Sequence, residues 1–542
     1  MILPHSARWV GRLALATSGK CCGRQGPPGE VFARNRQSDC RQPRRKSGWL
    51  MPVLLQALVL QGLVLLSATA AFAQFGGGGG GGGFGGGGQQ GGQQGGQQGG
   101  QQGGQQGGQQ GAGGILVDAQ GVVKPAFVRE QGRGLSEKRR TELAGRALPA
   151  DLTAFSPLRK ISLAGLEQAC RQYAEKGQPV PPELRYLAGL QRIEYVFADP
   201  DGHDVIIAGP AEGFLVDASG KATGVGTRRS VLRLDDLLVA LRSQERGDGR
   251  VRCSIDPTPE GLARLNRFLQ QTSGAMTAGQ AKAKFAQLGK QLGPQVISVS
   301  GVPAESHFSW MLVEADIRMK RLSIGVDPAP IKGFQSYLQL VQKNEESLQR
   351  WWFAPFYQAF VQSADKLAYQ FAGQRVQLLA QQELLGPQGQ RTDAPFTSLS
   401  SEKFAQQFTR RFEEIAAAVP VFAELQNAFD LLVFAALLKK ERLPQQVGWR
   451  PSLLLDPQAA PTERDAVPKQ TDSVSNYKVL NQSLYIAQVS GGVVIDPFTL
   501  LNQHEYSSDS TGELARRREG ALQRPTSETP RWWWDGASTV AP

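Results

Sequence analysis

The sequence has few cysteines and histidines and lacks the short motifs that indicate a particular catalytic or cofactor chemistry. It holds five cysteines and four histidines in 542 residues. It lacks a P-loop, a dinucleotide-binding fingerprint, a Gly-x-Ser-x-Gly elbow and a His-Glu-x-x-His zinc motif. Only Cys170 and Cys253 lie beyond residue 73, too few for a disulfide framework or a four-thiolate zinc site. We therefore expect no cofactor and no metal, and the sequence identifies no catalytic residue.

Positive charge is also scarce once the N-terminal segment is set aside. The net charge of +12 includes ten of the 60 Lys and Arg residues, but only two of the 48 Asp and Glu residues, in positions 1–73. The rest of the chain is nearly balanced, and it offers little of the phosphate attraction that nucleic-acid binding requires. We therefore expect no nucleic-acid partner.

The N-terminal segment has the order of features found in a secretion signal. Basic residues at 41–46 precede an uncharged stretch, Trp49 to Ala73, which ends in Ala71-Phe72-Ala73, a small-x-small pattern. This predicts a leader over residues 1–73 that is cleaved before Gln74, so that the protein is exported to the periplasm, the cell envelope or the medium. An uncleaved anchor is the alternative, because the apolar run approaches the roughly 20 residues that span a bilayer.

Residues 74–114 consist almost entirely of Gly and Gln, and Gln-Gln recurs six times between Gln89 and Gln110. Glycine maximises chain entropy and nothing here can bury apolar area, which predicts a flexible spacer. The alternative is an aggregating Gln-rich tract. The interleaved glycines disfavour it, because glycine lowers the preference for strands.

Strand and helix signals alternate after the spacer and predict an α+β fold. We expect a sheet-rich part over residues 115–330, with a capped helix at 162–173, a hairpin at 193–208 and strands that include 309–317. The remaining boundaries are a mostly helical region at 331–445, a linker at 446–477, a returning C-terminal hairpin at 478–500 and a disordered tail at 501–542.

The best polar candidate lies between Met311 and Arg321. If this segment is a strand, one face carries the side chains of Glu314, Asp316, Arg318 and Lys320. Such a face could grip a polar ligand, or its carboxylates could tune each other for acid–base chemistry. The alternative is a lattice of ion pairs with a structural role.

Cys253 and His307 suggest a thiol nucleophile and its base. However, Cys253 alternates with Val251 and Ile255, which indicates an apolar environment where a thiol stays protonated. A buried structural cysteine is the favoured interpretation. In an oxidising compartment, a disulfide between Cys170 and Cys253 is a further possibility.

A cluster of acids and one histidine invites a metal-site interpretation; it consists of Asp199, Asp201, His203 and Asp204. The further oxygen ligands and the distal glutamate of an EF-hand are absent. The pattern therefore favours the turn of the predicted hairpin.

Aromatic residues are concentrated at Trp351, Trp352 and Tyr357, directly after Arg350. Aromatic platforms bind sugars and peptides, which an exported protein encounters. Alternatively, these side chains fill the core, where large aromatic residues usually lie.

Four sequence segments stand out together: Ile206 to Gly213, Leu234 to Leu237, Cys253 to Gly261 and Val313 to Lys320. In this order they resemble one exported bacterial family that is classed as a domain of unknown function. The resemblance covers most of residues 115–500 and implies export and a shared fold. It implies no activity and assigns no catalytic residue.

We therefore expect an exported, non-enzymatic binding or structural module, whose partner is an envelope protein, a peptide or a glycan and which meets the membrane only through its signal segment. The alternative is an exported hydrolase that uses carboxylates near Glu314 and Asp316. A hydrolase requires a cleft with converging acids, whereas a binding module requires a broad, shallow or aromatic face.

Overall fold

A computed structural model of the chain describes residues 114–117, 122–126, 145, 148–217, 220–271, 277–342, 348–386, 388–473, 475–480, 483–525 and 531–535. They all belong to the second of two compact units, Met1–Gln74 and Phe75–Pro542. The predicted leader and, apart from Gly114, the predicted spacer lie outside the described residues.

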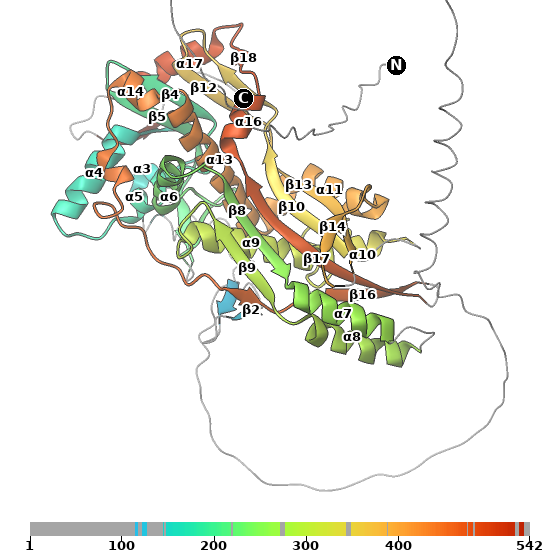
Figure 1. Cartoon of the computed structure of the whole chain (residues 1–542). Helices are drawn as coiled ribbons and strands as arrows, with labels where there is room; N and C mark the ends of the chain where they lie inside the picture. Colours follow the sequence, from blue (N-terminus) through green and yellow to red (C-terminus); the bar gives the residue numbers. More distant parts are fainter. Residues whose placement is uncertain are drawn as a thin grey trace, which may run out of the picture. The chain divides into compact units, whose positions relative to one another are not determined.

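Seven strands form the smaller of two main sheets, in the order β18-β11-β12-β4-β5-β3-β19. Their bounds are β3 (Ser156–Ser162), β4 (Tyr195–Asp199), β5 (Asp204–Ala211), β11 (Ala359–Gln362), β12 (Ala368–Ala372), β18 (Ser507–Ser508) and β19 (Trp533–Asp535). Figure 1 labels β4, β5, β12 and β18 of this sheet. The predicted hairpin is confirmed, since β4 and β5 pair antiparallel up to Asp199 and Asp204. Both edge strands come from the C-terminal tail.

The larger sheet follows the order β1-β2-β15-β9-β8-β17-β10-β13-β14, and β16 pairs with β17 off this path. The strands are β1 (Gly114–Val117), β2 (Val122–Ala126), β8 (Val251–Pro257), β9 (Gln295–Ser300), β10 (Leu348–Phe356), β13 (Arg375–Leu385), β14 (Arg391–Asp393), β15 (Gln470–Thr471), β16 (Ser475–Leu480) and β17 (Ser483–Ile495). The long strand β17 runs parallel to β10 and antiparallel to β8. A separate two-stranded sheet joins β6 (Phe214–Val216) and β7 (Ala222–Gly224).

The centre of the protein is the helix α13 (Pro420–Lys440), which begins with proline at a position where the missing N–H costs nothing. It is the one described helix that is long and apolar enough to cross a membrane, and its apolar window is wholly buried inside the protein. It packs against α6 (Leu234–Glu245), α9 (His307–Ser323) and α12 (Phe412–Ala418). This burial on all sides is typical of a core helix.

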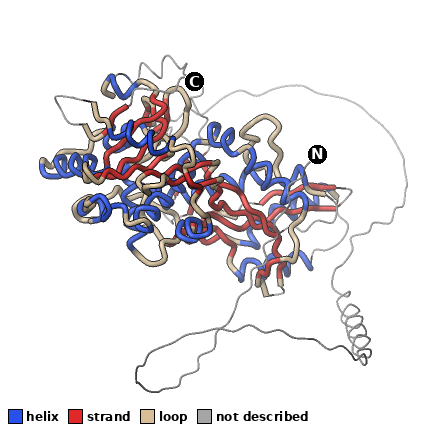
Figure 2. The backbone as a smooth tube through the Cα atoms, turned by 90° about the horizontal axis from the view of Figure 1, so that it is seen from above, coloured by secondary structure: helices blue, strands red, loops and turns tan. Residues whose placement is uncertain are grey.

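The other helices cover the sheets, and Figure 2 shows them around the strands of both. The predicted helix is confirmed as α4 (Leu163–Glu175), where the Ser162 hydroxyl accepts a hydrogen bond from the Gly165 N–H. The remaining helices are α3 (Ala150–Thr153), α5 (Pro182–Arg185), η2 (Leu187–Gly189), α7 (Pro259–Gln271), α8 (Ala278–Leu292), α10 (Tyr337–Leu340), α11 (Leu399–Arg410), α14 (Leu443–Val447), α15 (Ser452–Leu455), α16 (Pro497–Gln503) and α17 (Glu513–Leu522).

Helices α9 and α11 lie on one face of the larger sheet (Figure 1). The apolar residues that face them include Cys253 on β8, Phe353 on β10 and Val493 on β17, which are all buried. The opposite face of these strands carries polar side chains and is partly exposed.

The α+β class and the C-terminal hairpin, formed by β16 and β17, are confirmed. The strand predicted at 309–317 is wrong, because these residues form α9. Helix α9 is buried on nearly all sides, so its polar residues do not mark a solvent-facing stripe, and alternation is a poor guide to its structure.

Three boundaries also differ. Residues 348–393 of the predicted helical region form five strands, and helix prevails only from Leu399 onward. The predicted linker contains α15 and β15. The predicted disordered tail contains the end of α16, all of α17 and two strands, and it buries Trp533 and Trp534, whose large apolar area favours order.

Candidate functional site

The open face of the larger sheet is built by simple strand alternation. Along β8, the side chains of Val251, Cys253 and Ile255 are buried against the helices, whereas Arg252 is exposed and Ser254 is half-buried on the other face. Strand β9, beside β8, and strand β10, beyond β17, alternate in the same way around Ser298 and Trp352. Because side chains alternate between the faces of a strand, the outward residues of the three strands form one surface.

Pairing brings small residues together at the centre of this surface. Gly492 on β17 lies between Ser254 on β8 and Trp352 on β10, and Ser254 in turn pairs with Ser298 on β9. The row therefore runs from two serines across a glycine to an indole ring.

The two glycines of β17 are required by the backbone around them. A Cβ on Gly492 would lie 1.9 Å from the carbonyl oxygen of Cys253, and one on Gly491 would lie 1.8 Å from that of Trp351. Gly491 also has a φ of +117°, a conformation that favours glycine. Without side chains here, the floor of the surface is hollowed next to Trp352.

The resulting hollow has a volume of about 290 Å³. This is near the lower end of the range for small-molecule sites, about 300–1,000 Å³. Its lining includes the hydroxyls of Ser254, Ser298 and Ser300, the side chains of Arg252, Arg350 and Trp352, and the glycine pair. It is a partly open hollow that combines an aromatic wall with hydroxyl and guanidinium groups.

Asp256, which lines the hollow, belongs to an ion-pair network. Asp256 and Glu383 share the guanidinium of Arg391, with an N···O distance of 3.2 Å to each. The Ser490 hydroxyl donates to Glu383 at 2.8 Å. These contacts hold both carboxylates in place, and the single guanidinium offsets one of their two negative charges.

The arginines at the hollow differ from Arg391. Within the described part of the chain, neither Arg252 nor Arg350 has a carboxylate within ion-pair distance. The guanidinium of Arg350 instead lies over the Trp352 ring, 5.2 Å from its centroid. This cation–π contact orients the guanidinium and leaves its charge unpaired.

The predicted polar site around Glu314 and Asp316 is not a surface. Both residues lie on α9, where a separation of two positions turns their side chains to different sides of the helix. Glu314 is 2 % exposed and Asp316 is fully buried. The prediction of one shared polar face depended on a strand and is therefore wrong.

Glu314 belongs to a buried cluster between α9 and α13. Its carboxylate accepts a hydrogen bond from the Lys221 ammonium at 2.8 Å, and Glu424 lies 3.5 Å from the same nitrogen. Arg318 approaches Glu314 at 4.0 Å. Burial opposes the charged ammonium, but the two glutamates raise the pKa of Lys221 above its ordinary value. This cluster stabilises the packing of the helix.

Asp316 and Lys320 form a second buried pair, with an N···O distance of 3.0 Å. Lys320 also donates to the carbonyl oxygens of Ile255 at 2.5 Å and Gly491 at 3.3 Å, so it links α9 to β8 and β17. Burial raises the pKa of Asp316 to about 7, against the opposing effect of Lys320. The pair lies behind the floor of the hollow and does not line it.

The two cysteines are free and buried, so the possible disulfide between Cys170 and Cys253 is not formed. Burial raises the pKa of Cys170 to about 12 and that of Cys253 well above its ordinary value. The Nδ1 atom of His307 lies 3.0 Å from Asp236, and although burial lowers the pKa of this histidine, Asp236 raises it overall. The thiol–imidazole hypothesis therefore has no geometric support.

The acidic hairpin turn does not gather its side chains. Asp199 accepts a hydrogen bond from the Gly202 N–H, and His203 contacts the Val447 carbonyl oxygen through Nδ1. Asp204 is buried and accepts from the hydroxyl of Ser162. Among the described residues, no group of three His, Cys, Asp or Glu is placed to hold a metal ion.

The three aromatic candidates do not share one surface, because Trp351 and Trp352 point to opposite faces of β10. Trp351 and Tyr357 are core residues: Trp351 packs edge-on against Tyr337 and Phe404, and the Tyr357 hydroxyl donates to Asp430. Trp352 alone of the three predicted residues lines the hollow. The core interpretation is confirmed for Trp351 and Tyr357, and ligand binding at Trp352 stays a prediction.

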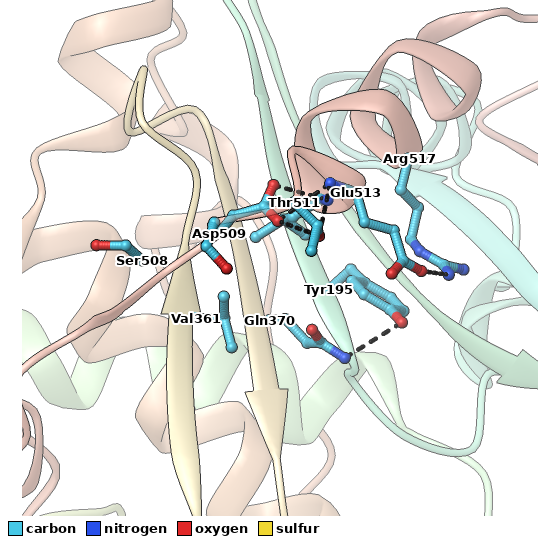
Figure 3. Close-up of a pocket in the computed structure, with 10 residues that line it drawn as sticks. Tyr195, Val361, Gln370, Ser508, Asp509, Thr511, Glu513 and Arg517 are labelled. Atoms are coloured by element: carbon cyan, nitrogen blue, oxygen red, sulfur yellow. Dashed lines mark hydrogen bonds and ion pairs between the residues drawn. The ribbon is translucent and has the colours of Figure 1, made fainter.

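A second hollow, of about 270 Å³, lies between α17 and the smaller sheet (Figure 3). Its polar groups already bind one another: Asp509 accepts from the N–H groups of Glu513 and Leu514, and Arg517 pairs with Glu513. Few donors remain there for a ligand, so the open face of the larger sheet is the stronger candidate.

The fold and the hollow define an α+β protein with an open polar face on its larger sheet. Residues 253–337 match the model of a family described as a protein of unknown function (DUF1598), which confirms the resemblance to a family of unknown function. This region contains most of β8, all of β9 and α9, but not β10 or β17. No curated protein and no solved structure matches the chain.

Several residues of the hollow were not predicted. The alternation that marked Val251, Cys253 and Ile255 as buried also implies that Arg252 and Ser254 point outward, so a local signal existed for them. No local signal indicates that Gly492 lies beside Trp352, because these residues pair across 140 positions.

Proposed function

We propose that the chain is an exported binding protein that holds a polar ligand from the envelope or the medium on the open face of its larger sheet. The observation that carries this proposal is the hollow in which the Trp352 indole stands beside the side-chain-free Gly492. An aromatic wall next to hydroxyl and guanidinium groups is suited to a ligand with both apolar and polar edges.

The shallow, aromatic character of the hollow favours binding over catalysis. Of its two nearby carboxylates, Asp256 lines the hollow and Glu383 does not, and both are held in ion pairs with Arg391. General acid–base catalysis needs groups within hydrogen-bond reach of a bound substrate. The alternative of a hydrolase around Glu314 and Asp316 has less support, because both side chains are buried in separate ion pairs.

The N-terminal sequence supports the exported part of the proposal. A cleavable leader would deliver the folded region across a membrane, and the Gly/Gln segment would act as a flexible tether in front of it. Cell fractionation combined with N-terminal sequencing tests this step, and a mature protein that begins at Gln74 outside the cytoplasm is expected. Full-length protein in the cytosol with its first 73 residues attached would contradict export.

Binding is tested by screening the full chain against envelope glycans and peptides, with Trp352→Ala as the test variant. Loss of the indole is expected to weaken binding about tenfold, as for other aromatic contacts with ligands. Phe396→Ala is the control, because Phe396 is 68 % exposed and does not line the hollow. Equal affinity of the Trp352 variant and the wild type, or no binding by the wild type, would overturn the proposal.

A further inference from the structure

The open face carries an uncompensated positive charge, and its position restricts the ligand. Arg252 and Arg350 line the hollow without a carboxylate partner in the described residues. Asp256, which also lines the hollow, and Glu383 are both held by Arg391, so one negative charge remains against the two arginines and the net charge here is +1. Two unpaired guanidiniums at a hollow attract an anionic ligand, and their flat donor edges match carboxylates.

The two arginines stand at different levels of the sheet. Arg350 pairs with Ser490 of β17, and Arg252 pairs with Val494 of the same strand. Four residues of a strand span about 13 Å, so the backbone positions of the two arginines are separated by about this distance along the strands, on opposite sides of the level of Gly492 and Trp352. A ligand that contacts both arginines and the ring between them is best served by more than one negative group.

The groups between the arginines are those that contact sugars. The Trp352 ring presents a flat apolar surface, and the hydroxyls of Ser254, Ser298 and Ser300 line the same hollow. None of the three hydroxyls has a hydrogen-bond partner in the described part of the protein, so each is available to a ligand. Ring C–H groups and sugar hydroxyls match this combination of an aromatic wall and neutral donors.

A peptide fits this surface less well. Peptides commonly bind a sheet by adding a strand to an open edge. The hollow lies over β8, β17 and β10, which are interior strands of the larger sheet with neighbours on both sides. Their backbone groups are already paired, and only side chains are available on the face.

From these observations we infer that the ligand of the hollow is an acidic oligosaccharide with negative groups on more than one ring. The inference rests on the proposed binding function and specifies the class of its ligand. Arg350 and Arg252 bind the acidic groups, Trp352 contacts a sugar ring between them, and the serines bind ring hydroxyls. Carboxylated and sulfated sugars share this chemistry.

The inference is tested with the full-length protein by calorimetry against four probes: a tri-galacturonate, the neutral tri-galactose, a sulfated trisaccharide and a poly-glutamate peptide. Tri-galacturonate or the sulfated probe is expected to bind about tenfold more tightly than the neutral sugar. The affinity of the acidic probe should fall as the salt concentration rises, because added ions screen the partly exposed guanidiniums. The comparison of the two acidic sugars distinguishes a carboxylate ligand from a sulfate ligand.

Arg350→Gln and Arg252→Gln are each expected to weaken acidic-sugar binding about fivefold to tenfold. Arg464→Gln is the matched control, because Arg464 is highly exposed and does not line the hollow. Circular dichroism and urea unfolding verify that each variant is folded.

The outcomes separate the class of ligand from the binding function itself. If the neutral sugar binds as tightly as the acidic ones, or if the arginine variants bind normally, the acidic-sugar inference fails and the binding function stands. If the poly-glutamate peptide binds more tightly than the acidic sugars and this binding requires Trp352, the acidic-sugar inference also fails and the binding function stands. If none of the four probes binds, the inference fails, and the wider ligand screen with Trp352→Ala decides the proposed function.

Discussion

The guanidinium of Arg159 donates hydrogen bonds to both carboxylate oxygens of Asp535, which lies 376 positions further along the chain, with N···O distances of 2.9 Å. Arg159 is fully buried on β3, and Asp535 is the last residue of β19. The pair fixes the C-terminal strand to the edge of the smaller sheet. A bidentate contact of this kind is among the stronger ion pairs in proteins.

Replacement of Asp535 by Ala is expected to lower the free energy of unfolding by about 2 kcal/mol, because it leaves the buried Arg159 charge without its counterion. The effect falls short of the fully buried case, since Asp535 is partly exposed. Urea unfolding measures it. Glu513→Ala is the control, and the loss of its surface pair with Arg517 should cost at most about 0.5 kcal/mol. Equal effects of the two substitutions would show that the tail is not held by this contact.

Elements with local signals were predictable from the sequence. The cap at Ser162, the turn between β4 and β5 and the alternation along β8 each depend on residues close together in the chain. Hydrophobic periodicity and turn residues are informative in these places because one side of the element is buried and the other is not. The α+β class follows from such elements.

Helix α9 was not predictable in this way. Hydrophobic periodicity reveals a helix when one of its faces is buried and the other is exposed. Helix α9 has no such exposed face, since even Glu314, Asp316 and Lys320 are buried in ion pairs. The predicted polar face therefore came from sequence alternation that has no counterpart in three dimensions. The same limit applies to β19, whose order depends on contact with Arg159, 376 positions away in the sequence.

The residues that line the hollow were predictable only in part. The aromatic cluster named Trp352, which lines the hollow. The alternation that turns Trp352 outward and Trp351 inward was not foreseen, because the segment was expected to be helical. The glycine floor depends on β17 running parallel to β10. Such long-range pairing leaves no mark in the local sequence.

Free thiols at Cys170 and Cys253 are expected in the native protein. Burial raises the pKa of both thiols, so alkylation with iodoacetamide at about pH 8 should not modify them in the folded state. Unfolding without reductant should make both fully reactive. Peptide mass spectrometry measures the modified fraction at each site. Labelling of the two peptides only after reduction would reveal the disulfide that the structure lacks.

Glu314→Gln is expected to lower the free energy of unfolding by about 2 kcal/mol, because it removes the nearest counterion of the buried Lys221 while Glu424 remains. Ligand binding at the hollow should be unchanged, since Glu314 does not line it. Urea unfolding and calorimetry measure the two effects. The control is Glu305→Gln, at an exposed pair with Arg464 that should contribute almost nothing. Loss of binding without loss of stability would instead favour a functional role for Glu314.

Asp316 should give the protein a pH-dependent stability of defined sign. Burial raises the pKa of this carboxyl group from 3.8 to about 7, so the folded state retains its proton where the unfolded chain has already released it. Proton binding then favours the folded state. This stabilisation is fully present below about pH 4 and is lost as the pH rises towards and through about 7.

In Asp316→Asn this titration is absent, so the difference in the free energy of unfolding between wild type and variant isolates it from the other ionisable groups. Between about pH 4 and pH 8, the wild type is expected to lose stability relative to the variant, by an amount on the order of 3 kcal/mol. Urea unfolding of both proteins across this range measures the difference. If the wild type gained stability relative to the variant instead, the attraction of Lys320 for an ionised Asp316 would outweigh the cost of burying that charge behind the sheet.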